Sequence, residues 1–168
     1  MAASGQKKQL ALDTNLLLDL AEGSDFAHDF RETFQAAGYT LLISPTVVQE
    51  LVFARKYGKP PIKQEWAGKA LHELLSNGIH PFDLSPVEHG IAEQFAVRLI
   101  QKRLLPEGEF NDGLILAEAS LHGVPLLVSS DKHLLNLEET ALKKSFEEAD
   151  LEPVSPANPK RLLKALRS

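Results

Sequence analysis

Four acidic residues are the side chains of this sequence whose type and placement best suit chemistry. They are Asp13, Glu50, Asp112 and Asp131, and each falls where we expect a strand to have just ended or a helix to have just begun. In an open α/β sheet those positions crowd one edge, where ligands bind. Converging carboxylates repel one another unless a cation holds them, and oxygen ligands suit a hard ion such as Mg²⁺ or Mn²⁺. The placement therefore predicts metal-dependent chemistry on a phosphate ester.

The first two acids also have ordinary structural explanations. Asp13 follows LAL and precedes a helix, so it is either an N-cap or a ligand at the C-terminal end of a central strand. Glu50 lies in mid-helix, where capping cannot explain it, between apolar helical neighbours such as Val47 and Phe53. It is either a solvated glutamate at the helix border or a partly buried carboxylate that needs a partner such as a metal.

The other two acids open later helices. Asp112 is either a first-turn acid favoured by the helix dipole or a ligand, and Asn111 could cap the same helix. Asp131 follows two serines that could cap its helix in its place. Glu109, three residues before Asp112, is either an auxiliary ligand or a solvated loop residue. Each position alone is weak evidence, and the joint placement at one sheet edge favours a site.

Alternating strands and helices must position these acids. We expect strands at 9–13, 41–44, 79–82, 125–129 and 151–155, and helices at 14–20, 24–36, 45–56, 61–76, 85–103, 111–122, 131–137, 138–146 and from 159 onward. This order predicts an α/β fold in which a parallel sheet is flanked by helices on both faces. We interpret 9–168 as a single domain and 1–8 as a flexible N-terminus.

Composition narrows the class of protein. The net charge of −5 argues mildly against a nonspecific nucleic-acid coat protein, but it does not exclude a nuclease because two divalent ions would cancel the four acids. The absence of cysteine excludes disulfides and thiolate zinc sites. No apolar run reaches membrane-spanning length, and 1–8 lacks the apolar core of a signal peptide. A cytoplasmic protein without membrane association is expected.

Three segments carry a family resemblance. LALDTNLLLDL, SPTVVQEL and FNDGLILAEASLHGVPLLVSSDKHL together resemble the PIN-domain ribonucleases, including the VapC-like toxin ribonucleases. The resemblance implies a three-layer α/β/α fold, bound Mg²⁺ or Mn²⁺ and hydrolysis of RNA phosphodiesters. The family's acidic ligands correspond here to Asp13, Glu50, Asp112 and Asp131. Asp13 would be the central ligand, and Ser129 and Asn15 would support the acids.

The same resemblance implies partners. They are an RNA substrate and, for a toxin of a toxin–antitoxin pair, an antitoxin protein, while self-association into a homodimer is left open. Candidate RNA-binding residues are the basic side chains Arg55, Lys56, Lys59 and Lys63. The chain is longer than a compact toxin of this family, with extra length near 57–63 that could alter substrate choice or replace the antitoxin contact. Tyr57 and Trp66 are interpreted as packing residues rather than platforms for bases.

Other functions fit the sequence less well. A phosphatase with an aspartyl nucleophile could start at Asp13, but position 15 is Asn15 and not a second acid. No GxSxG, Walker A, GxGxxG or HExxH motif is present. The alternative from another class is a catalytically silent PIN-like module that binds RNA or protein, and the presence of all four acids argues against it.

Overall fold

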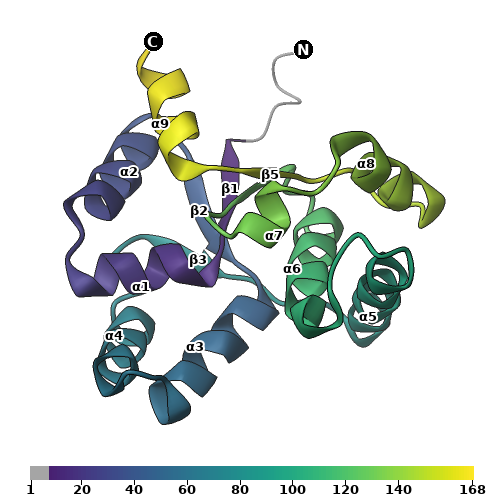
Figure 1. Ribbon diagram of the computed structural model, residues 1–168. Helices are drawn as coiled ribbons and strands as arrows, with labels where there is room; N and C mark the ends of the chain where they lie inside the picture. The colour runs from purple at the N-terminus through teal and green to yellow at the C-terminus, as the bar shows by residue number, and fades with distance from the viewer. Residues whose placement is uncertain (1–7) are drawn as a thin grey trace.

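The computed structural model describes residues 8–168 and has a parallel sheet at its centre. The five strands lie in the order β3-β2-β1-β4-β5 (Figure 1). Their bounds are β1 (Gln9–Leu12), β2 (Thr40–Ile43), β3 (Ile79–Pro81), β4 (Leu126–Val128) and β5 (Ser155–Ala157). The flexible N-terminus expected at 1–8 lies outside the described residues except for Lys8, whose carbonyl accepts a hydrogen bond from the Thr40 amide at 2.8 Å.

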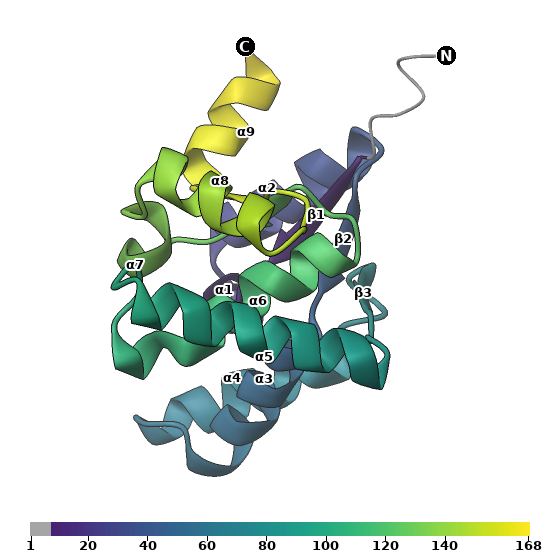
Figure 2. The ribbon, with the colours of Figure 1, turned by 90° about the vertical axis from the view of Figure 1, so that its right-hand side faces the viewer.

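Helices cover both faces of this sheet. They are α1 (Thr14–Glu22), α2 (Asp25–Ala36), α3 (Pro45–Tyr57), α4 (Pro61–His72), α5 (Pro86–Gln101), the 3₁₀ turn η2 (Glu107–Glu109), α6 (Phe110–Leu121), α7 (Lys132–Leu135), α8 (Glu139–Glu148) and α9 (Pro159–Arg167). Figures 1 and 2 show α1 and α2 on one side of the sheet and α5 and α6 on the other. The pair α3 and α4 lies below both groups in Figure 1. The expected α/β class with a three-layer arrangement is confirmed.

The strand sequences explain the sheet. β1, β2 and β4 read QLAL, TLLI and LLV, and most of their residues are buried because both faces are covered by helices. The two edge strands each contain proline, which cannot donate to a ladder and is confined to edges. The expected last strand at 151–155 is wrong in its bounds: Val154 packs into the core, and pairing with β4 begins only at Ser155.

The order of the strands creates a switch point beside β1. The chain lays down β2 and β3 on one side of β1 and then returns to place β4 and β5 on the other. At such a point the connections leave the carboxyl ends of neighbouring strands in opposite directions and open a crevice between them. The amide of Asp13 donates to the Val128 carbonyl at 3.0 Å, which fixes the ends of β1 and β4 side by side.

The C-terminal helix packs on the opposite end of the molecule from α3 and α4 (Figure 1). Leu163 is buried, and Leu162 and Leu166 lie partly buried against the core. Arg167 donates to both carboxylate oxygens of Asp29 on α2, at 2.7 and 2.8 Å. These contacts pack the apolar side of the basic C-terminal helix on the core and tie its end to α2. None of the helices in the described part of the chain has the length and apolarity needed to cross a membrane.

Candidate active site

A cleft of about 740 Å³ opens at the carboxyl end of the sheet. All four acids expected from the sequence line it: Asp13, Glu50, Asp112 and Asp131. Asp13 follows β1, Glu50 lies on α3, and the other two stand at the starts of α6 and α7. The topology thus brings together residues from four separate segments of the chain, as the switch-point geometry requires.

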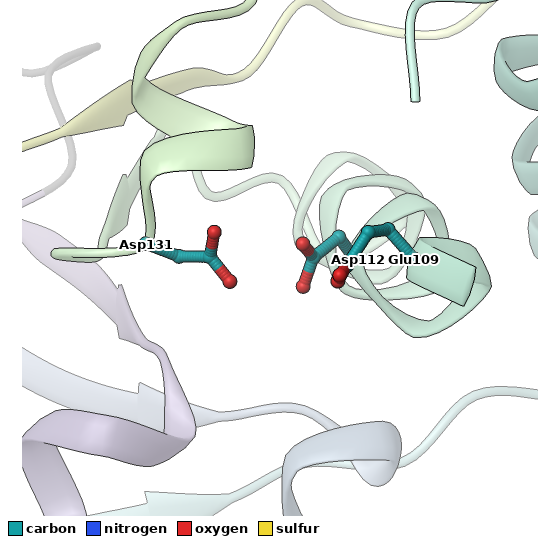
Figure 3. Close-up of side chains that lie close together, drawn as sticks. All are labelled: Glu109, Asp112 and Asp131. Carbon is teal, nitrogen blue, oxygen red and sulfur yellow. The ribbon is translucent and has the colours of Figure 1, made fainter. Parts of the chain in front are cut away.

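Three acids form the tightest group within this cleft. Glu109, Asp112 and Asp131 each offer a carboxylate oxygen, and these oxygens all lie within 4.8 Å of one another. Figure 3 shows Glu109 and Asp112 side by side at the start of α6, with Asp131 facing them from the start of α7. Glu109 is therefore placed as an auxiliary ligand would be, although the sequence favoured a solvated loop residue at this position.

Asp112 is the most unusual side chain of the group. It is only 6% exposed, and its Oδ2 atom is buried without any hydrogen-bond partner among the described residues. Burial is the largest cause that raises the pKa of Asp112 to about 8, and the nearby charges of Asp131 and Asp13 raise it further. A buried, unpartnered carboxylate oxygen beside two other acids is the arrangement that a bound cation would satisfy.

Asp13 is both a helix cap and a member of the site. Its Oδ1 accepts the Thr14 amide at 2.8 Å, and its Oδ2 accepts the Ser129 hydroxyl at 2.6 Å. Burial raises the pKa of Asp13 to about 6, against the lowering effect of hydrogen bonds from Ser129 and Thr14. The Ser129 oxygen also accepts the amide of Asp131 at 3.0 Å, so one hydroxyl links two of the acids.

Asp131 likewise caps the helix that it precedes. The sequence suggested that a neighbouring serine could do so, but the cap is Asp131 itself, which accepts the His133 amide at 2.8 Å. Figure 3 shows its carboxylate turned toward Asp112. The ring of His133 lies 3.5 Å from a carboxylate oxygen of Glu109 and so flanks the three-acid group on its exposed side.

Glu50 is held by residues from two other helices. Its Oε1 accepts the hydroxyl of Thr14, and its Oε2 accepts the side-chain amide of Asn111 at 3.2 Å. The sequence allowed Asn111 to cap α6. It does not do so, because the helix already begins at Phe110. Asn15, the expected supporter, lines the cleft but makes no side-chain hydrogen bond among the described residues.

Comparison with models of known protein families identifies the family of this chain. The family model of the PIN domain matches residues 10–140. The chain belongs to the PIN-domain family. The match spans all four acids and ends at the start of α8, so that most of α8 and all of β5 and α9 lie beyond it.

Solved structures share the fold of this PIN domain. VapBC2 from Rickettsia felis, bound to a DNA fragment from its promoter, is 21% identical with a TM-score of 0.60, over 89% of this chain and 98% of that chain. FitAcB from Neisseria gonorrhoeae is 21% identical with a TM-score of 0.51, over 89% and 97%. FitAB bound to an IR36 DNA fragment is 19% identical with a TM-score of 0.51, over 89% and 94%. No curated protein matches the sequence. At these identities the likeness establishes the fold alone.

The basic residues expected to bind RNA divide into two groups in the PIN domain. Lys59 and Lys63 line the cleft that holds the acids. Lys56 lines a neighbouring shallow hollow, and the Arg55 side chain lies along α4, close enough that a Cβ built on Gly68 would meet its Cδ at 3.4 Å. Only the first pair therefore lies in the cleft with the acids.

The expectation that Tyr57 is a packing residue is wrong. Its side chain is 61% exposed, because α3 turns this face toward the cleft and not toward the core. Trp66, on α4, does pack partly buried against the core, as expected. The two aromatic residues could not be separated by sequence, since both lie in segments of mixed polarity.

A buried ion-dipole contact that sequence reasoning missed joins the two helices bearing Glu50 and Asp112. Glu118 is 2% exposed and accepts both the amide of Thr46 at 3.1 Å and its hydroxyl at 2.6 Å. Thr46 lies in the first turn of α3, where amides lack helical partners and the dipole favours an acid. The signal that singled out Glu50, an acid among apolar helical neighbours, would also have found Glu118 in LAEASL.

Close packing behind Asp112 fixes the position of its helix. A Cβ built on Gly113 would lie 2.8 Å from both Cα and Cβ of Ala96, so α5 and α6 touch through their backbones there. Real Cβ atoms do not approach so closely, and any side chain at 113 would push α6 away from α5. The residue next to the buried acid is therefore glycine for a steric reason.

Proposed function

We propose that this PIN domain is a divalent-metal-dependent ribonuclease that hydrolyses RNA phosphodiesters. The observation that carries the proposal is Asp112, whose buried Oδ2 has no hydrogen-bond partner among the described residues and whose carboxylate is grouped with those of Glu109 and Asp131. A purely structural aspartate would be paired, because an unpaired buried oxygen costs about 1–3 kcal/mol. Membership of the PIN-domain family supports the same assignment.

The acids fit a hard divalent ion, Mg²⁺ or Mn²⁺. Asp112, Asp131 and Glu109 would hold it directly, and Asp13 and Glu50 would complete the set directly or through water. When bound, such an ion supplies positive charge that stabilises the negative charge developing on a reacting phosphate. The hydrogen bonds that Asp13 already accepts leave lone pairs on both of its oxygens, so capping and ligation do not exclude each other.

The chain's own residues hold these acids in place. Ser129 links Asp13 to Asp131 through one hydroxyl, and Thr14 and Asn111 fix the carboxylate of Glu50. Such preorganisation lets the site bind charge without rearranging at the moment of reaction. A catalytically silent module that binds RNA or protein would not need five acids lining one cleft, and this is why the nuclease is preferred.

An RNA cleavage assay tests the proposal. The purified protein, incubated with end-labelled RNA, should cut in Mg²⁺ or Mn²⁺ and stop in EDTA. Asp112→Asn should reduce cleavage by at least about 100-fold, since it removes the charge that the ion pairs with. Asp83→Asn is a matched control, because Asp83 is exposed and lies outside the cleft. Cleavage that survives EDTA, or that is equal in Asp112→Asn and the parent, would exclude this mechanism.

We further propose that the protein acts as the toxin of a toxin–antitoxin pair and that its partner binds at the same cleft. An acid-lined cleft attracts a basic side chain, which could replace the charge of the metal and so inhibit cleavage. Co-purification from the native host, with the neighbouring gene expressed, should recover a second protein that leaves upon addition of Mn²⁺ or high salt. Recovery of the free chain alone would contradict the toxin role and leave the nuclease proposal standing.

A further inference from the structure

Two large aromatic side chains stand exposed beside the acids. Phe53 is 64% exposed and Tyr57 61% exposed, and their ring centroids lie 4.9 Å apart with an angle of 49° between the planes. Both residues line the cleft that also holds Glu50. Rings left in water on a helix contribute nothing to the core, and grouped exposed apolar surface marks a binding site.

The helix places these rings in line with the acids. Residues 50, 53 and 57 are spaced i, i+3 and i+7 on α3, which sets all three on one face. Along the helix axis Phe53 stands about 5 Å and Tyr57 about 10 Å beyond Glu50. A ligand seated on the acids is therefore led along this face toward the C-terminal end of α3.

Two cations lie at that end of the cleft. Lys59 follows α3 and Lys63 lies in the first turn of α4, and both line the cleft. Neither side chain forms an ion pair or a hydrogen bond within the part of the chain that the structure describes. The cleft thus changes from acidic at one end to cationic at the other, with flat rings between the two.

This sequence of groups matches the repeating chemistry of a nucleic-acid strand. Lysines pair with phosphates, and an aromatic ring offers a stacking surface to any base. Only an unpaired base can use such a ring, because in a duplex both faces of each base are covered by its neighbours. The apolar side chain of a protein partner could also cover the rings, but it would leave the two lysines without counter-charge.

We propose that Phe53, Tyr57, Lys59 and Lys63 form a nucleotide subsite. It stacks one unpaired base on the rings and binds the flanking phosphates with the lysines, next to the phosphodiester that the acids position. This inference rests on the proposed ribonuclease function and adds to it a requirement for an unpaired nucleotide on the α3–α4 side of the cut.

The test compares two RNAs and a set of matched variants. One RNA is a hairpin with an unpaired loop, and the other is a blunt duplex of the same sequence. The double variant F53L/Y57L keeps apolar side chains but removes the flat rings, and F53W/Y57W keeps flat rings. Leu75→Ala and Lys143→Ala are controls, because both residues are exposed and neither lines the cleft.

The readout depends on whether the parent protein cuts RNA. If it cuts, KM and kcat are measured in Mg²⁺. We expect F53L/Y57L to raise KM for the hairpin about tenfold with little change in kcat, and F53W/Y57W to restore it. If the parent does not cut, the ribonuclease proposal fails by itself. The RNA then stays intact, and the Kd for RNA is measured by fluorescence anisotropy in the same buffer. We expect the same rise of about tenfold in Kd for F53L/Y57L and the same restoration in F53W/Y57W.

The contribution of the lysines is tested separately, by the salt dependence of RNA binding. Removing Lys59 and Lys63 together should lower the salt dependence of binding, with the slope of log K against log salt falling by about 0.7 for each phosphate that is no longer neutralised. Lys143→Ala should leave the slope unchanged. A hairpin affinity that is equal in F53L/Y57L and the parent, or the absence of any RNA binding, would overturn the subsite. Loss of a co-purifying protein in F53L/Y57L, with RNA affinity retained, would assign these rings to a protein partner and also overturn it.

Discussion

Single carboxylates in this protein serve a local and a distant structure at once. Asp13 caps α1 with one oxygen and accepts the Ser129 hydroxyl with the other, and Asp131 caps α7 while it faces Asp112. A carboxylate has two oxygens and about four lone pairs, so the capping and ligand interpretations of an acid at a helix start are not alternatives. Asp112 differs from both, because it caps nothing and its inner oxygen is unpaired among the described residues.

Substitution of Asp112 distinguishes a metal site from an isolated acid. In EDTA at low salt, Asp112→Asn should leave the free energy of unfolding unchanged or raise it by about 1 kcal/mol, because it removes an acid whose ionised form is disfavoured by burial and by the charges of Asp131 and Asp13. Mn²⁺ should stabilise the parent by mass action and the variant much less. Thermal melts of the parent, Asp112→Asn and Asp112→Ala, each with EDTA and with Mn²⁺, provide the measurement. Equal shifts of the Tm by Mn²⁺ in all three proteins would show that Asp112 is not part of the metal site.

The raised pKa values of Asp112 and Asp13 make the metal-free protein less stable as pH rises. Folding moves the pKa of these carboxyls from 3.8 up to about 8 and about 6, so the folded state holds protons that the unfolded chain releases. Their contribution is complete below about pH 4 and is lost as pH rises through 6 and then 8. We therefore expect the Tm in EDTA to fall between about pH 4 and pH 8.

Thermal melts of the same variants across this pH range test whether the Tm falls as pH rises. Asp112→Asn should flatten the fall between about pH 6 and pH 8, where the Asp112 carboxyl is the later of the two to lose its proton. Mn²⁺ should stabilise more at high pH than at low pH, because metal ligands must be deprotonated. A Tm that rises with pH in EDTA, or an unchanged slope in Asp112→Asn, would contradict the assignment of the raised pKa values.

At the scale of elements, the site depends on how α3 and α6 are joined. Glu118 on α6 reaches the first turn of α3, and Asn111 on α6 reaches Glu50 on α3. The hydrogen bonds at the two ends of this contact fix the separation of the helices that carry Glu50 and Asp112. Gly113 sets the corresponding distance between α6 and α5 by allowing their backbones to touch.

A double-mutant cycle measures the contact between Glu118 and Thr46. Glu118→Leu should lower the free energy of unfolding by about 2–3 kcal/mol, since it leaves buried polar groups of Thr46 unpaired. Thr46→Val should cost less, and the two changes together should cost less than their sum by about 1–2 kcal/mol. Urea unfolding of the four proteins gives these values. Additive costs would mean that the two side chains stabilise the fold independently.

At the scale of the whole molecule, the segment beyond the family match completes the domain. β5 adds the last strand beside β4, and the amide of Ser129 donates to the Ala157 carbonyl at 3.0 Å. The serine that links Asp13 to Asp131 is thus held in place by a strand that lies outside residues 10–140. α9 then returns the chain to α2, where Leu163 enters the core.

Unfolding should therefore be one cooperative transition that includes the C-terminal helix. Leu163→Ala leaves a cavity and should cost about 2–4 kcal/mol. Trp66 is the single tryptophan and lies on α4, so its fluorescence reports on a distant part of the domain. Fluorescence and far-UV circular dichroism should shift together in this variant. A helical signal lost at lower denaturant than the Trp66 transition would show that α9 melts alone.

Sequence patterns determine the features of this protein that depend on local order along the chain. Alternating buried strands and helices predict the parallel sheet, and acids placed after strands predict a shared cleft, because the carboxyl ends of parallel strands meet at one edge. Asp13, Glu50, Asp112 and Asp131 do line one cleft. Ser129, which the family resemblance implies as a supporter of the acids, directly follows β4.

Only the tertiary structure decides which side chains face one another across that edge. The grouping of Glu109 with Asp112, the support of Glu50 by Asn111, and the exposure of Tyr57 all depend on how each helix is rotated and how far it stands from its neighbours. The same rotation separates Lys59 and Lys63 from Arg55, which lie within one short basic stretch of sequence. Packing of several elements sets these angles and distances together, and no local pattern of residues contains them.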